Sequence, residues 1–128
     1  MKIKLNSVIV KDQEMALRFY TEVLGFEKNV DIPAGDYRWL TVIAPSDPDG
    51  AQLLLEPNAH APAATYQQAL FDDGIPLTSF AVDDINEEFQ RLKSHGVVFR
   101  TEPTNVGTAV VAVFEDTCGN LIQMYQES

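Results

Sequence analysis

The stretch that decides the fold is Val10-Lys-Asp-Gln-Glu-Met-Ala-Leu-Arg-Phe-Tyr-Thr-Glu-Val-Leu-Gly-Phe26. Asp12 is a good helix cap, because its side chain can accept a hydrogen bond from a backbone N–H of the first helical turn. Gly25 is a typical helix end, since glycine adopts the left-handed conformation at little cost. The stretch therefore predicts one helix between two strands, residues 2–10 and 26–32. Its apolar face is formed by Met15, Leu17, Phe19, Tyr20, Val23 and Leu24.

The same arrangement returns 72 residues further along the chain. One extra residue in the first helix then brings Gly25 onto Gly96. The agreement in strand, cap and helix end predicts an internal duplication. The identical residues at this shift are Leu5 and Leu77, Ser7 and Ser79, Val10 and Val82, and Asp12 and Asp84.

Turn-forming residues divide the remaining chain into further elements. We expect strands at 37–44, 51–56, 77–83, 97–101, 106–114 and 120–126, and helices at 64–73 and between Asp84 and Gly96. The predicted fold class is α+β, with two βαβββ modules whose sheets form a shared cleft in one domain, 1–128. Module one covers about 1–56, a linker and short helix 57–74, and module two about 75–126.

Composition narrows the function classes. The chain has 128 residues, 45% of them hydrophobic, and a formal net charge of −10. This charge argues against a nucleic-acid or anionic-membrane partner, because both require clustered Lys and Arg. No apolar run reaches the roughly 18 residues of a membrane span. The single Cys118 excludes an intramolecular disulfide and a cysteine-based zinc site, and we expect a cytoplasmic protein.

Strand alternation assigns side chains to two faces of each sheet. We expect Val8, Val10, Phe80 and Val82 to point toward the helices. The opposite set is smaller and more polar, as in a pocket wall, although a packed barrel interior with two satisfied hydroxyls would have the same pattern. This opposite set consists of Leu5, Ser7, Ile9, Leu77, Ser79 and Ala81.

The paired modules resemble the vicinal oxygen chelate superfamily, which groups glyoxalase I, extradiol dioxygenases, and bleomycin- and fosfomycin-resistance proteins. The resemblance covers about residues 3–126. Besides the stretch quoted first, four segments carry it: Leu53-Leu-Leu-Glu-Pro57, Phe80-Ala-Val-Asp-Asp-Ile85, Leu92-Lys-Ser-His-Gly96 and Val113-Phe-Glu-Asp-Thr-Cys-Gly-Asn-Leu-Ile-Gln123.

The resemblance implies one divalent metal, held by His or Glu at four positions that fall here on Leu5, Glu56, Leu77 and Gln123. Only Glu56 is a charged donor, because leucine has no lone pair and Gln123 offers a neutral carbonyl oxygen. We therefore expect no cofactor. The residual metal donors are Glu56, Gln123 and the linker residue His60, whose alternative is a surface loop histidine.

Two further candidates, Glu56 and Trp39, have two interpretations each, and two other residues have one. Glu56 could act as an acid or base or pair with a cationic ligand, or it could be held by solvent or by Arg38. Trp39 could form an aromatic wall or pack in the core. We expect His95 to lie at a helix end, where its charge suits the helix dipole. Cys118 is interpreted as an exposed bystander in a turn.

Three functions remain. The first is a metal-free protein that binds a small organic molecule, in particular a cationic one, in the inter-module cleft, as the bleomycin-resistance branch does. The second is a glyoxalase-type lyase or dioxygenase-related enzyme, including a metal-independent one with Glu56 as acid or base. The third is a regulatory or partner-binding module. The resemblance also implies a homodimer. The expected ligand-binding residues are Leu5, Ser7, Trp39, Glu56, Leu77, Ser79, Gln123 and Tyr125.

Overall fold

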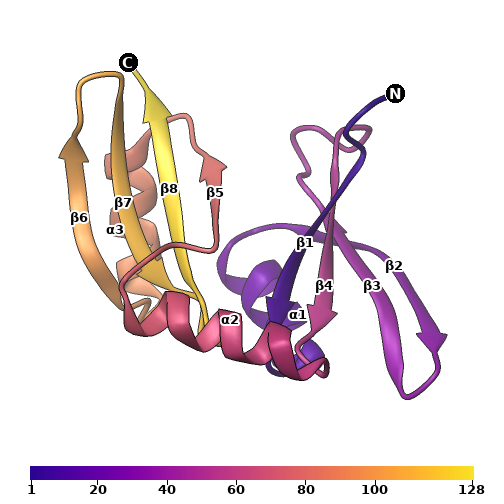
Figure 1. Cartoon of the computed structure of the whole chain (residues 1–128). Helices are drawn as coiled ribbons and strands as arrows, with labels where there is room; N and C mark the ends of the chain where they lie inside the picture. The colour runs from indigo at the N-terminus through magenta and orange to yellow at the C-terminus, as the bar shows by residue number, and fades with distance from the viewer. The chain divides into compact units, whose positions relative to one another are not determined.

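The computed structural model describes the whole chain, Met1–Ser128. The chain folds as two compact units, Met1–Ala64 and Thr65–Ser128 (Figure 1). Each unit contains a four-stranded mixed sheet and a strand-helix-strand-strand-strand order, so the predicted α+β class and the duplication are confirmed. No helix combines the length and the apolar composition that crossing a membrane requires.

Unit 1 is a sheet of order β1-β4-β3-β2 with one helix on it. Strands β1 and β4 run parallel, and the other neighbours run antiparallel. Its fully buried core includes Val8, Val10, Leu40, Leu55 and Tyr20. Its elements are β1 (Leu5–Val10), α1 (Gln13–Arg18), the π-helical turn η1 (Phe19–Val23), β2 (Glu27–Ala34), β3 (Tyr37–Ile43) and β4 (Gln52–Pro57).

Unit 2 repeats this plan with the order β5-β8-β7-β6. The rings of Phe89 and Phe99 form an edge-to-face pair with their centroids 4.6 Å apart. The buried core of this unit includes Phe114, Ile122 and Met124. The helix α2 (Ala61–Asp72) connects the two halves of the chain. The remaining elements are β5 (Thr78–Ala81), α3 (Ile85–Ser94), β6 (Phe99–Asn105), β7 (Ala109–Glu115) and β8 (Leu121–Glu127).

Both predicted helix caps are present. The side chain of Asp12 accepts a hydrogen bond from Met15 N–H at 2.9 Å, and that of Asp84 accepts one from Glu87 N–H at 3.0 Å. The extra residue of the first helix forms part of η1, where Leu24 N–H bonds to Phe19 C=O five residues back. A π-helical turn is the expected way to accommodate one inserted residue without moving the ends of a helix.

The structure differs from the predicted boundaries where proline lies near an element end. α2 begins at Ala61, three residues before the predicted start, because Pro62 fits the first turn of a helix. β6 continues to Asn105 instead of ending at 101. It is an edge strand, and register shifts around Thr101 allow it to pass through Pro103.

A buried polar network fixes the turn between β7 and β8. The carboxylate of Asp116 accepts hydrogen bonds from Cys118 N–H at 2.8 Å, Asn120 N–H at 3.0 Å and Asn120 Nδ2 at 2.8 Å. Gln67 of α2 donates to Cys118 C=O at 3.2 Å and to Asn120 Oδ1 at 3.0 Å. The prediction of an exposed Cys118 was therefore wrong, because α2 covers the turn and the cysteine is buried.

Thr117 in this turn has a left-handed backbone, with φ of 63°. A β-branched residue pays about 1 kcal/mol or more in this conformation, which asparagine tolerates better. We expect Thr117→Asn to raise the free energy of unfolding by about 1 kcal/mol in urea denaturation. The exposed Thr108, which has a negative φ, is the matched control, and Thr108→Asn should change stability by less than about 0.5 kcal/mol. Equal changes in the free energy of unfolding for the two variants would show that the backbone of Thr117 is not strained.

Candidate functional site

The unit 1 sheet has one face packed against α1 and one face turned away from it, which we call the open face. Val8 and Val10 are fully buried on the α1 side, so alternation places Leu5, Ser7 and Ile9 on the open face, as predicted. Large apolar side chains stand exposed there. Their exposed fractions are 42% for Leu5, 55% for Ile32, 48% for Tyr37 and 41% for Trp39.

Trp39 and Glu56 belong together on the open face. Thr41 pairs with Leu54 at the end of the antiparallel β3–β4 ladder. Two residues beyond this pair, Trp39 and Glu56 stand on the same face of the two strands. Ile9 flanks Glu56 on the parallel neighbour β1, and Ile32 flanks Trp39 on β2. The indole and the carboxylate therefore share this face with apolar neighbours, and the exposure of Trp39 shows that it does not pack in the core.

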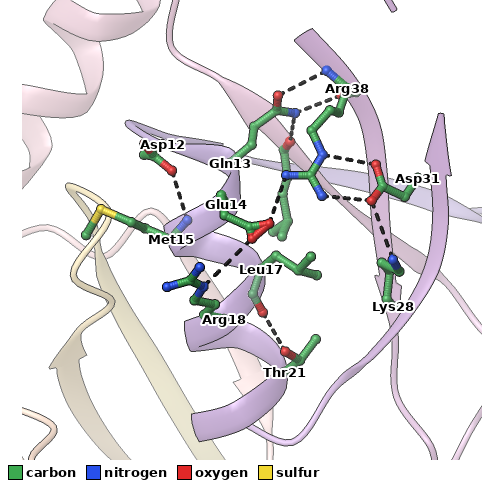
Figure 2. Close-up of polar contacts among 11 residues, drawn as sticks. Asp12, Gln13, Glu14, Met15, Leu17, Arg18, Thr21, Lys28, Asp31 and Arg38 are labelled. Carbon is green, nitrogen blue, oxygen red and sulfur yellow. Dashed lines mark hydrogen bonds and ion pairs between the residues drawn. The ribbon is translucent and has the colours of Figure 1, made fainter. Parts of the chain in front are cut away.

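Arg38 does not hold Glu56. It lies on the α1 side of β3, where it donates to Asp31 from Nε at 3.0 Å and from Nη2 at 2.7 Å, and to Glu14 from Nη1 at 3.3 Å (Figure 2). These hydrogen bonds lower the pKa of Asp31 and raise that of Arg38. Glu56 is exposed on the opposite face and is not paired with this guanidinium.

In unit 2 the corresponding face carries polar groups. Gln123 Nε2 donates to Ser79 Oγ at 3.0 Å, which brings two predicted site residues together. Leu77 lies next to β5, where its N–H donates to Leu121 C=O. Tyr125 is half-buried and lies beside Ala81.

The strand registers change one equivalence made from the sequence. Ile9 pairs with Glu56, and the equivalent Ala81 pairs with Tyr125. Ser7 pairs with Leu54, and the equivalent Ser79 pairs with Gln123. The counterpart of Glu56 in unit 2 is therefore Tyr125, and Gln123 corresponds to Leu54.

The donor chemistry does not fit the divalent metal that the resemblance implies. Leu5 and Leu77 have hydrocarbon side chains, and the position equivalent to Glu56 carries a phenol.

The two histidines lie at helix ends. His60 is exposed just before α2, and its carbonyl accepts hydrogen bonds from Ala63 N–H and Ala64 N–H. His95 is the C-terminal cap residue of α3, as predicted, and its Nδ1 lies 2.9 Å from Arg91 C=O. Neither histidine lies on a strand of the open face.

Comparison with known proteins agrees with this architecture. Residues 2–124 match the model of the Glyoxalase/Bleomycin resistance protein/Dioxygenase superfamily. The chain belongs to this superfamily. A relative in Bacillus subtilis (strain 168), the uncharacterized protein YurT, is 55% identical over 127 residues, which cover 99% of this chain and 100% of the relative.

Two solved structures of the superfamily fold are also similar. The crystal structure of UcmS2 has a TM-score of 0.84 and 28% identity, and the match covers 98% of this chain and 97% of that one. TnmS3, described as an antibiotic binding protein from Streptomyces sp. CB03234, has a TM-score of 0.76 and 28% identity over 100% of this chain and 97% of that one.

Sequence reasoning missed Gln13 as part of this site. Its side chain contacts the backbone of both β3 and β4, which carry Trp39 and Glu56. A glutamine in the first turn of a helix is an ordinary surface residue by pattern alone. Ile32 was also missed, although strand alternation from the expected 26–32 element could have placed it on a face with Val30.

Proposed function

We propose that this chain binds a small organic molecule with a cationic group on the open face of unit 1, without the metal chemistry of the superfamily. The observation that carries the proposal is that Trp39 and Glu56 lie on the same face of neighbouring strands, among exposed apolar side chains. An indole face attracts a cation through its quadrupole, and a carboxylate adds a full negative charge. Together they fit an ammonium or similar group attached to an apolar body.

Three further observations support this proposal. The formal net charge of −10 favours the approach of a cation. Leu5 lies at the position where the superfamily's metal ligand would be and supplies apolar contact area instead. TnmS3, with the same fold at 28% identity, is an antibiotic binding protein. We include in the proposal the homodimer that the resemblance implies and the cytoplasmic location expected from the single cysteine.

A titration with benzyltrimethylammonium tests the proposal, with uncharged neopentylbenzene as the neutral analogue of equal shape. Trp39 is the only tryptophan, so its fluorescence reports binding at this face. We expect saturable binding with a preference for the cation of at least about fivefold, because the exposed carboxylate alone contributes about 1 kcal/mol. The preference should fall in Glu56→Gln, where only the indole still favours the cation, and stay unchanged in Glu22→Gln, which changes an exposed carboxylate of η1.

The role of the indole is tested by thermal shift, because Trp39→Ala removes the fluorescent group. The change should weaken benzyltrimethylammonium binding about tenfold, as expected for a lost cation–π contact with its apolar area. The exposed Tyr66 is the control, and Tyr66→Ala should leave binding unchanged. Binding that survives both Glu56→Gln and Trp39→Ala would place the site elsewhere, and no saturable binding to the wild type would refute the cationic ligand.

A further inference from the structure

Strands β3 and β4 are paired over only part of their length. Two residue pairs form the ladder, Thr41 with Leu54 and Val42 with Leu53. Beyond Leu54 the strands separate, and Figure 1 shows them diverging toward the end that carries Tyr37 and Pro57. The corresponding β7–β8 ladder of unit 2 is continuous from Ala109 to Glu115. The separation is therefore a property of unit 1 and not of the repeated plan.

The side chain of Gln13 bridges this separation from α1. Its Nε2 donates to Arg38 C=O at 2.7 Å and to Leu55 C=O at 2.9 Å, and its Oε1 accepts from Arg38 N–H at 3.1 Å (Figure 2). Arg38 belongs to β3 and Leu55 to β4. One amide thus supplies the hydrogen bonds that a ladder would otherwise make, and it fixes the distance between the two backbones.

The bonded backbone groups lie next to the proposed binding residues. Trp39 follows Arg38, and Glu56 follows Leu55, and both point to the open face. The Arg38 side chain also holds this part of β3 in place, because it forms ion pairs with Glu14 of α1 and with Asp31 of β2. A change in the Gln13 bridge would therefore move the indole relative to the carboxylate.

We propose that Gln13 is a positioning residue that sets the spacing between Trp39 and Glu56 and thereby the affinity of the open face for a cation. Gln13 itself lies on the α1 side of the sheet and contacts backbone groups. The effect of Gln13 on affinity rests on the proposed function. Its effect on the position of Trp39 does not depend on that function.

The test compares Gln13→Met with Gln68→Met in the full chain. Methionine has a similar length to glutamine but forms no bridge. Gln68 is an exposed glutamine whose amide donates within α2 to Asp72 at 2.8 Å, so it is the matched control. Without ligand, Gln13→Met should shift the emission of Trp39 to longer wavelength and increase its quenching by acrylamide. It should also weaken benzyltrimethylammonium binding about fivefold, and Gln68→Met should do neither.

The outcomes separate the two proposals. Unchanged Trp39 emission and quenching in folded Gln13→Met overturn the positioning role. A shifted emission with unchanged affinity overturns the link between spacing and binding. A wild-type protein that does not bind benzyltrimethylammonium refutes the proposed function, and the Trp39 spectra still decide whether Gln13 positions this residue. If Gln13→Met does not fold, Gln13→Glu replaces it, because glutamate keeps the bond from Arg38 N–H and loses both donated bonds.

Discussion

Replacing Asp116 with alanine should lower the free energy of unfolding by at least about 3 kcal/mol. The carboxylate is fully buried and accepts three hydrogen bonds, from Cys118 N–H, Asn120 N–H and Asn120 Nδ2. A hydrogen bond to a charged group contributes about 1.5 to 3 kcal/mol, and its loss leaves a buried donor without a partner. Urea denaturation followed by circular dichroism would measure the change.

Two variants separate this network from a general effect of losing an acidic side chain. Asp116→Asn keeps one acceptor oxygen for the backbone N–H groups but sets an NH₂ against Asn120 Nδ2, so we expect an intermediate loss. Asp36 is an exposed carboxylate in the β2–β3 turn, and Asp36→Ala should change stability by less than about 0.5 kcal/mol. A loss below about 1 kcal/mol for Asp116→Ala would mean that the network contributes little in solution.

Tyr20→Ala should destabilise unit 1 by about 4 kcal/mol, the usual cost of deleting a buried aromatic ring. Tyr20 is fully buried, and its ring lies 5.7 Å from that of Phe19 and 6.4 Å from that of Phe26. Trp39 belongs to the same unit, so its fluorescence in urea would follow the unfolding of unit 1.

Tyr66→Ala is the control for this prediction. Its side chain is 55% exposed on α2, so the same truncation should cost less than about 0.5 kcal/mol. Similar midpoints for Tyr20→Ala and the wild type would contradict the assignment of Tyr20 to the core of unit 1.

The sequence was sufficient for the elements and their order. Capping residues and helix-ending glycines depend on a few neighbouring residues, so Asp12, Asp84, Gly25 and Gly96 could be interpreted directly. The predicted extra residue of the first helix also has a structural counterpart in η1. Proline was misleading at 62 and 103, because its effect depends on whether a strand is at an edge or a helix is in its first turn.

The candidate site was only partly accessible from the sequence. Alternation placed Leu5, Ser7 and Ile9 on one face, but the placement of Trp39 and Glu56 on the same face of neighbouring strands depends on the β3–β4 register. The long turn between those strands sets this register, and local patterns do not encode it. Register also explains why the sequence analysis matched Glu56 with Gln123 instead of Tyr125. The paired residues Ile9 and Glu56 are 47 positions apart in the chain, whereas the equivalent pair, Ala81 and Tyr125, is 44 positions apart.

Because Cys118 is buried, the opening of the β7–β8 turn can be measured by thiol labelling. Cys118 is only 1% exposed, and Gln67 of α2 donates a hydrogen bond to its carbonyl. A water-soluble thiol reagent can therefore label it only during the moments when the turn opens, and the chain has no second cysteine to compete. The labelling rate, divided by the rate for an unfolded peptide, gives the equilibrium constant for that local opening in the native protein.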